Sequence, residues 1–388
     1  MSGVSVLQFG NTTKQDRALL RRFVAFHWKH YRHEPRYIPL LDYEYLGLKL
    51  LGIRGFFEPG NLFFRHAEIR FFLAQAGGET VGRCMALVNH RHNARWNDRA
   101  GFFGQFECVD DTGVAAVLLE EAARWLKQHG MTVIRGPQNL PFNEATPGVL
   151  TAGFDSRPVV YYHFNKPYYA DLLQAVGFAP LCRVFSWEVP VMNPMEEKLE
   201  RVGRRVMERF QVTVERFGER PFALRTKEML EVYNEAWHDN FGFVPFTEEE
   251  FSTIMKDLAL IMDKDLFLFL YVKGELAAFF GGVPNIFERM APLPWCRRCE
   301  LVRAVRMLLT KGRITGFRVG YLGVKKQYRR LGLDGVMLWQ QKMLTQRAGY
   351  EYGDLGWVLE GNASTINLAA FMRAVPSKTY TIFQKEIP

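Results

Sequence analysis

The stretch of sequence that decides the fold is LGVKKQYRRLGLDG, residues 322–335. It stands between an apolar run typical of a strand (316–324) and a helical pattern (335–348). A glycine-containing turn that leads into a helix presents unpaired backbone N–H groups to an anion, and the guanidinium groups of Arg329 and Arg330 suit a phosphate. These residues predict a diphosphate-binding loop, with a basic surface turn at a strand–helix junction as the alternative.

The elements predicted around this loop follow an order that occurs twice along the chain. In the second half, hydrophobic periodicity and glycine turns predict helices and strands over residues 227–240, 248–262, 266–272, 276–283, 299–311, 316–324, 335–348, 352–360, 363–373 and 379–386. In the first half, the same patterns predict them over residues 14–31, 69–75, 80–89, 101–109, 112–129, 131–136, 168–176 and 184–189. The repeat predicts two mixed α/β units: an N-terminal domain over residues 1–192, a linker with a helix and a strand over 193–224, and a C-terminal domain over 225–388.

Length and composition are those of a folded protein of more than one domain. The chain has 388 residues, 48% of them hydrophobic and 23% charged, and one domain is expected for roughly each 150 residues. Apolar runs are shorter than the roughly 18 residues that cross a bilayer, and the charged N-terminal segment disfavours a secretory signal. Five scattered cysteines favour a reducing compartment. We therefore expect a cytoplasmic protein; Cys296 and Cys299 lack a second pair nearby, so we expect no bound metal.

Positive charge is concentrated in one segment of the chain. The formal net charge is +9, and residues 297–330 hold eleven Lys or Arg but one acid, Glu300. Such a patch attracts a phosphate-bearing ligand, an anionic membrane or a nucleic acid. The sequence has no helix-turn-helix or zinc-finger pattern, and the patch includes the predicted phosphate loop. The charge therefore favours a phosphate-bearing co-substrate over DNA.

The loop resembles the pyrophosphate loop of the GNAT acyltransferases, (Gln/Arg)-x-x-Gly-x-(Gly/Ala), which binds coenzyme A. Arg329 and Gly332 match this pattern, whereas Asp334 stands where the family has Gly or Ala. The preceding strand edge and the C-terminal tail also resemble the family, at residues 322–324, 357–362 and 378–383.

This resemblance implies two tandem GNAT-fold units, each with a mixed, mostly antiparallel sheet flanked by helices. It also implies acyl-CoA as co-substrate and no permanently bound cofactor. The residues expected to bind CoA are Leu322, Gly323, Val324, Gln327, Tyr328, Arg329, Arg330, Leu331, Gly332, Leu333, Asp334 and Gly335.

The N-terminal half resembles a second GNAT unit that lacks the CoA loop. At the corresponding place it carries ECVDDTG, residues 107–113, whose three acids would repel a diphosphate. Residues 136–169 resemble a bacterial group of tandem GNAT-like proteins, and the chain is similar to the bacterial ceramide synthases. The resemblance implies transfer of an acyl group, which we expect to be longer than acetyl, from a thioester to an amine such as a sphingoid base. The alternatives are an acetyl-CoA-dependent N-acetyltransferase of a small amine and a non-catalytic protein that binds CoA or DNA.

The GNAT resemblance also implies a base and an oxyanion site where two strands splay apart. Glu360 is the expected base, because partial burial raises the pKa of a carboxyl; capping of the next helix is the alternative. Tyr380 would return a proton to the thiolate or pack in the core, and Asn362 would hold substrate or cap a helix. Backbone N–H groups near residues 322–324 would bind the oxyanion. The expected acceptor-site residues, with an ordinary loop as the alternative, are Asn139, Asn143 and Glu144.

Two features favour contact with lipid. Residues 299–313 combine leucines and valines with arginines, a pattern typical of helices that lie on an anionic membrane. Residues 292–295 (PLPW) precede this segment, and phenylalanines crowd the first half of the chain. The helix would otherwise cover its own core, and the rings would otherwise fill a core. The prediction is a lipid-like amine acceptor and peripheral contact of residues 292–313 with the inner face of the cytoplasmic membrane, with no nucleic-acid partner.

Overall fold

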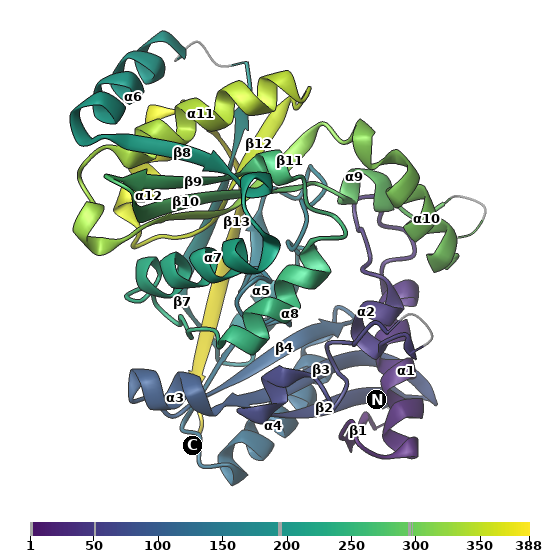
Figure 1. Ribbon diagram of the computed structural model, residues 1–388. Coiled ribbons are helices and arrows are strands. Elements are labelled where there is room, and N and C mark those ends of the chain that lie inside the picture. Colours follow the sequence, from purple (N-terminus) through teal and green to yellow (C-terminus); the bar gives the residue numbers. More distant parts are fainter. Residues whose placement is uncertain (1–2, 50–51, 193–195, 294–295, 297) are drawn as a thin grey trace. The chain divides into compact units, whose positions relative to one another are not determined.

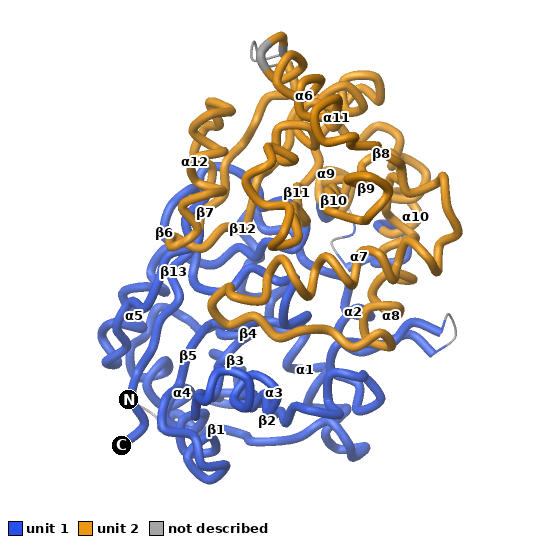
Figure 2. The backbone as a smooth tube through the Cα atoms, turned by 60° about the vertical axis from the view of Figure 1, so that its left-hand side comes forward, with its two compact units in different colours: residues 1–184, 291–303, 378–388 blue, residues 185–290, 304–377 orange. Residues whose placement is uncertain are grey.

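The computed structural model describes residues 3–49, 52–192, 196–293, 296 and 298–388 (Figure 1). The chain divides into two compact units, drawn in two colours in Figure 2. Unit 1 comprises residues 1–184, 291–303 and 378–388, and unit 2 comprises residues 185–290 and 304–377. Both units are mixed α/β with mostly antiparallel strand pairs, which confirms the predicted fold class.

Unit 1 is built on a sheet with the strand order β1-β2-β3-β4-β5-β13, in which β4 and β5 are the parallel pair. The short β6 pairs with β13. The strands are β1 (Ser5–Phe9), β2 (Ala67–Ala76), β3 (Glu79–Asn89), β4 (Ala100–Cys108), β5 (Val133–Gly136), β6 (Val149–Ala152) and β13 (Val375–Glu386). The helices are α1 (Lys14–His30), α2 (Asp42–Leu46), α3 (His90–Trp96), α4 (Thr112–Gln128) and α5 (Tyr169–Ala175).

Unit 2 repeats this arrangement with the strand order β12-β11-β10-β9-β8, in which β11 and β12 are parallel. The strands are β8 (Val212–Arg216), β9 (Phe267–Val272), β10 (Glu275–Pro284), β11 (Gly316–Val324) and β12 (Tyr352–Leu359), while β7 (Ala179–Pro190) begins in unit 1 and ends in unit 2. The helices are α6 (Glu196–Phe210), α7 (Phe222–Ala236), α8 (Glu248–Leu258), α9 (Phe287–Met290), α11 (Leu333–Arg347) and α12 (Ala363–Phe371), while α10 (Glu300–Thr310) begins in unit 1 and ends in unit 2. In each unit a run of antiparallel strands ends in a parallel pair joined by one helix, β4-α4-β5 in unit 1 and β11-α11-β12 in unit 2.

The compact units follow other limits than those predicted from the sequence. Residues 378–388 pack in unit 1, because β13 pairs with β5 from Phe383 opposite Gly136 to Glu386 opposite Val133. Residues 193–224, predicted as a linker, contribute α6 and β8 to unit 2. The strands β1 and β6 were not predicted. A strand pattern shows that a segment is extended and half-buried, but it does not show which sheet receives the segment.

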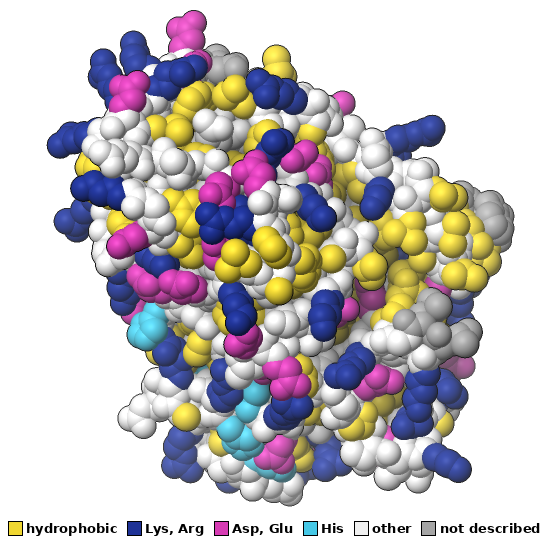
Figure 3. All heavy atoms as spheres, in the orientation of Figure 1, with side chains coloured by type: hydrophobic (Ala, Val, Ile, Leu, Met, Phe, Trp, Pro, Cys, Tyr) yellow, Lys and Arg dark blue, Asp and Glu magenta, His cyan; other side chains and the backbone are white. Residues whose placement is uncertain are grey.

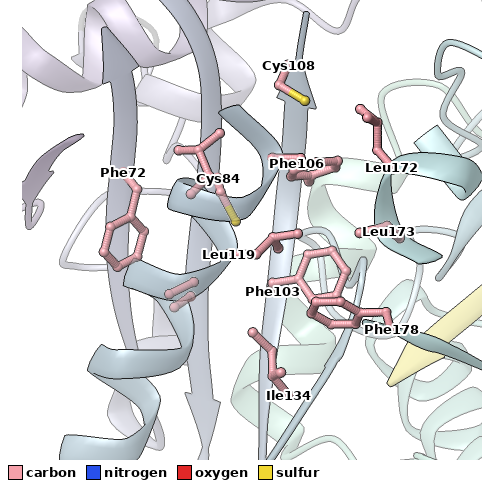
Figure 4. Packing of buried hydrophobic residues seen from close by; sticks show 14 of the residues in the cluster. Phe72, Cys84, Phe103, Phe106, Cys108, Leu119, Ile134, Leu172, Leu173 and Phe178 are labelled. Atoms are coloured by element: carbon pink, nitrogen blue, oxygen red, sulfur yellow. The ribbon is translucent and has the colours of Figure 1, made fainter. Parts of the chain in front are cut away.

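Two hydrophobic clusters cover the two faces of the unit 1 sheet. Successive side chains of a strand point to opposite faces, so Phe72 packs beneath α4 with Phe103 and Leu119 (Figure 4), whereas Phe71 packs in the other cluster. From the sequence, the phenylalanines of the first half could belong either to a core or to a binding surface. In the structure they lie in or against these clusters: Phe57, Phe71, Phe72, Phe102, Phe103 and Phe106 are buried, and Phe56, Phe63 and Phe64 are partly buried. The rings of the first half therefore fill the core.

Two of the five cysteines form a disulfide, and two others are buried thiols in the core of unit 1. A disulfide joins Cys296 and Cys299, which the sequence did not predict. Cys84 and Cys108 are buried in the core of unit 1, where burial raises the pKa of both thiols. Among the described residues, no group of three or more His, Cys, Asp or Glu side chains could hold a metal ion.

A buried ion network joins α7 to the first strands of unit 2. The guanidinium of Arg225 is completely buried and forms ion pairs with Glu215 (2.8 Å) and Glu228 (2.6 Å). It also donates a hydrogen bond to the hydroxyl of Tyr271 (2.8 Å) and lies over the ring of Phe269, 4.1 Å from its centre. The side chain of Arg225 thus connects α7 to β8 and β9, the two strands of unit 2 farthest from β12 in its sheet.

We expect Arg225→Ala to lower the free energy of unfolding by about 2–4 kcal/mol, because Glu215 and Glu228 lose their fully buried cation and keep only the more exposed Arg220 as an ion-pair partner. The matched control is Lys227→Ala on the same helix, whose ion pair with Glu248 is exposed on both sides (66% and 65%) and should contribute less than about 1 kcal/mol. Urea unfolding of the two variants measures the difference. Equal losses would show that the Arg225 network does not stabilise unit 2.

Candidate active site

The parallel strands β11 and β12 of unit 2 part from one another halfway along. Their pairing runs from Gly316 opposite Tyr352 to Val319 opposite Leu355, and none is found beyond this point among the described residues. Opposite β10, the register of β11 shifts between Val319 and Tyr321, so that Gly320 is an extra residue of the bulge type. The strands therefore open toward their carboxyl ends, and in the described part of the chain β11 is paired beyond Gly320 with β10 alone.

The loop that follows β11 bends into α11 through two residues in the left-handed region. Arg330 has φ +68° and Gly332 has φ +84°. The N-cap residue of α11 is Gly332, which has no side chain to cap the first turn. The first N–H groups of a helix have no partner within the helix. Consecutive N–H groups in such a turn, together with the positive end of the helix dipole, form a cradle for an anion. The loop thus combines a left-handed turn with the start of a helix, and its role as a diphosphate site stays a prediction.

Carboxylates of α7 and of the segment that follows it neutralise part of the loop's positive charge. Lys325 forms an ion pair with Glu231, and Lys326 forms one with Asp239 (2.9 Å). The two arginines of the loop differ from the lysines. Arg329 donates to the carbonyl of Ala236 (3.0 Å), and Arg330 is exposed, with no ion pair among the described residues.

The basic segment 297–330 is not one continuous surface. Arg303, Arg318 and Lys325 are buried, with exposed fractions of 0%, 5% and 8%. Arg318 donates to the carbonyl of Gly356 (3.0 Å), beside the point where β11 and β12 part. The eleven-to-one excess of cations in the sequence therefore overstates the charge at the surface, and Arg297 lies outside the described residues.

An aromatic wall lies against the end of β11 on the side of α7. A Cβ at Gly323 would lie 2.5 Å from the ring of Trp237, so only glycine lets this ring rest on the strand. Trp237 stacks on Tyr233 (4.8 Å between ring centres), which also contacts the ring of Tyr321 (6.0 Å). Leu322, Gly323 and Val324, predicted for CoA binding, therefore lie on the strand edge between this aromatic wall and the loop.

Glu360 and Asn362 follow β12 directly, at the edge of the sheet where β11 leads into the loop. Carboxyl ends of parallel strands meet at one edge of a sheet, so the loop and Glu360 share that edge. Glu360 is partly buried. The side chain of Asn362 accepts the N–H of Thr365 (3.2 Å) and caps α12, which is the alternative that the sequence left open for it.

Tyr380 lies in the part of β13 that belongs to unit 1. Its side chain is 1% exposed, its hydroxyl donates to the carbonyl of His163 (2.8 Å), and its ring packs against Tyr162 (5.9 Å). These contacts favour the packing alternative for Tyr380.

Residues 137–144 of unit 1 lie against β4, the strand that corresponds to β11. The N–H of Gln105 on β4 donates to the side-chain oxygen of Asn139 (2.7 Å), and a Cβ at Gly104 would lie 2.0 Å from the carbonyl oxygen of Gln138. The residue that bends the strand here, Gln105, has φ +46°. The side chain of Asn139 therefore accepts a hydrogen bond from the backbone of β4, a contact for which the sequence offers no signal. Asn143 and Glu144 follow in the same loop, and both are partly buried.

The helix that follows β4 is capped by an acid. Asp111 accepts the N–H groups of Gly113 (2.8 Å) and Val114 (3.1 Å) at the start of α4. A carboxylate thus takes the position that an anionic ligand would need, and this agrees with the repulsion predicted from residues 107–113. The start of α11 has no such cap, so the two units differ at the same step of the same topology.

Comparison with known proteins gives relatives over nearly the whole chain. No family model matches it. Protein YghO of Escherichia coli K12 is 28% identical over 389 residues, covering 95% of this chain and 93% of that protein. The bacterial ceramide synthase of Caulobacter vibrioides is 30% identical over 340 residues, covering 84% and 86%. Among solved structures, a tandem GNAT protein from the clavulanic acid biosynthesis pathway matches with a TM-score of 0.56 at 11% identity, covering 100% and 99% of the two chains. This likeness shows the tandem GNAT fold.

We expect Arg330→Asn to weaken coenzyme A binding by about 1.5–3 kcal/mol, because a charge-assisted contact with phosphate is lost. Asparagine tolerates the left-handed backbone at this position, so the change removes the charge without new strain. The matched control is Arg347→Asn, an exposed arginine at the other end of α11. Titration calorimetry with coenzyme A measures both, and an unchanged affinity in Arg330→Asn would place the diphosphate elsewhere.

Proposed function

Because the chain belongs to the family of the bacterial ceramide synthase of Caulobacter vibrioides, we propose that it transfers a long-chain acyl group from acyl-CoA to the amine of a lipid-like acceptor, such as a sphingoid base. The protein is an acyltransferase of the GNAT type, with two tandem units. The proposal assigns the CoA-binding step to unit 2.

One observation carries the assignment to unit 2. The start of α11 has backbone N–H groups without a side-chain cap, next to a strand edge that has lost its neighbour. In unit 1 the corresponding N–H groups are occupied by Asp111 and the corresponding strand edge by Asn139. An acyl-CoA needs both an anion cradle and an open strand edge, and these occur together in unit 2.

The proposed reaction is direct attack of the amine on the thioester carbonyl. The C–N bond forms, the C–S bond breaks, and coenzyme A leaves as a thiolate that takes up a proton. N–H groups of β11 between Gly320 and Val324 stabilise the oxyanion. Glu360 accepts the proton that the attacking nitrogen loses. The protein's main contribution is to hold amine and thioester in line, which replaces an encounter in solution.

The family relationship and an exposed apolar helix support a lipid-like acceptor. The phenylalanines of the first half no longer support it, since they fill the core of unit 1. DNA binding has less support than the sequence offered, because Arg303, Arg318 and Lys325 are buried. In the described part of the chain, no helix has the length and hydrophobicity to span a membrane.

We expect turnover to rise steeply with the length of the donor chain. Each methylene that is buried on binding contributes roughly 0.8 kcal/mol, so palmitoyl-CoA with a sphingoid base should react faster than acetyl-CoA with a polyamine. Release of free thiol measures the rates for acetyl-, hexanoyl- and palmitoyl-CoA with each amine. Arg330→Asn serves as the control for CoA-dependent turnover. A preference for acetyl-CoA and polyamine would instead support the small-amine N-acetyltransferase.

We expect Glu360→Gln to lower kcat by about 10²–10⁴-fold, the usual contribution of a general base, with little change in CoA affinity. The matched control is Glu351→Gln, an exposed glutamate immediately before the other end of β12. Steady-state kinetics and thermal melting are measured on both variants. A fall in melting temperature with unchanged kcat would assign Glu360 to capping of α12 and leave the base to another group.

A further inference from the structure

The helix α10 exposes its apolar face to solvent, whereas its arginines face the protein. Five of the thirteen exposed large hydrophobic side chains in the described part of the chain lie on these 11 residues. Leu309 is 81% exposed and Leu301 is 69% exposed, and the other three are Val302, Val305 and Leu308. The spacing i, i+1, i+4, i+7, i+8 places all five on one stripe of the helix. Figure 3 shows hydrophobic side chains gathered at the place that α10 occupies in Figure 1.

The opposite face of α10 is attached to the protein by polar contacts. Arg303 is completely buried, donates to the carbonyl of Pro39 (2.6 Å) and lies 5.7 Å from the ring centre of Trp28. Arg306 donates twice to the carbonyl of Arg289 (3.0 and 2.6 Å). Met307 is the large apolar side chain buried on this face. Because the two arginines fix the orientation of the helix, the exposure of its leucines is part of the folded structure.

The connection between β10 and β11, which carries α10, is longer than the connection between β3 and β4. Ten residues, 90–99, connect β3 to β4, whereas 31 residues, 285–315, connect β10 to β11. The common topology of the two units does not require the extra residues. An insertion that exposes a stripe of leucine and valine is expected to have an apolar partner.

The charges around this stripe are positive. Arg298 precedes α10 and Lys311 and Arg313 follow it, and all three are exposed. The one acid of the helix, Glu300, accepts the N–H of Asp42. Burial raises the pKa of Glu300 to about 7. Nothing on the stripe itself is acidic.

We propose that α10 is a docking helix for an anionic lipid surface, with Leu301, Val305 and Leu309 inserted among the acyl chains and Lys311 and Arg313 on the headgroups. An exposed apolar stripe flanked by cations matches the boundary between acyl chains and anionic headgroups. A second copy of this chain fits less well, because two such surfaces would bring their cations together. The inference rests on the proposed function in one respect, since a lipid-like acceptor would enter from the same bilayer. Of the residues 292–295, Pro294 and Trp295 lie outside the described residues.

The test is co-sedimentation of the full chain with vesicles of phosphatidylcholine alone and with about one third phosphatidylglycerol. We expect binding to the anionic vesicles and at least tenfold weaker binding to the neutral ones. The double change Leu301→Ser with Leu309→Ser, and separately Lys311→Glu with Arg313→Glu, should each weaken binding to anionic vesicles at least tenfold.

Matched controls come from exposed residues of unit 2 away from α10. Leu260→Ser changes a leucine that is 64% exposed, and Lys256→Glu with Lys264→Glu reverses two exposed lysines. Both controls should bind vesicles like the unchanged protein. Coenzyme A affinity, measured by calorimetry on every variant, shows that each one is folded, and it tests the proposed CoA site independently of vesicle binding.

Two outcomes would overturn the inference. One is equal binding of the unchanged protein and the Leu301→Ser, Leu309→Ser variant to anionic vesicles, or no binding by either. The other is a dimer in the absence of lipid that this variant dissociates, which would assign the stripe to a second copy. Vesicle binding without any acyl transfer would sustain the docking helix while refuting the proposed function.

Discussion

The parting of β11 from β12 is the constraint on which the rest of unit 2 depends. Two parallel strands share hydrogen bonds as far as Val319 and Leu355, and then a bulge at Gly320 turns one away from the other. The parting exposes a strand edge inside a folded protein, which would be costly unless a ligand or water satisfies it. It also directs the chain after Val324 into a turn whose two left-handed residues open the first N–H groups of α11 to an anion. The proposed thioester site and the proposed diphosphate cradle would thus have one structural cause.

In unit 1, which has the same topology, the groups at the corresponding positions are hydrogen-bonded within the protein. There the strand edge is occupied by the side chain of Asn139, the start of α4 is capped by Asp111, and a buried ion pair between Arg83 and Glu107 (3.0 Å) adds fixed charge to the interior. Each of these contacts satisfies a group that a ligand would otherwise need. Unit 1 therefore has the topology of unit 2, but the groups that correspond to the proposed substrate site are hydrogen-bonded within the protein.

The sequence predicted the secondary structure and the loop well, for physical reasons that are local. The strand–turn–helix pattern of residues 316–348 depends on periodicity and on glycine, and the structure has β11, the turn and α11 there. The capping role of Asn362 and the acidic start of α4 were also among the sequence-based expectations, since caps depend on neighbours in the chain. Predictions that depended on partners far away in sequence were less complete. The buried state of Arg303 and Arg318, the contact between Asn139 and Gln105, and the unit that receives β13 all depend on tertiary contacts that a charge count or a periodicity does not contain.

The pairing of β13 with β5 also affects the order in which the chain can fold. Phe383 and Gly136 are neighbours in one sheet although about 250 residues separate them along the chain. During synthesis, the edge of β5 therefore has no partner strand until residues 378–386 have been made. Contacts of such long range close slowly, because the intervening chain loses entropy before the pairing is gained. Unit 1 is first in sequence but last to be completed, and the ribosome must finish unit 2 before the sheet of unit 1 can close.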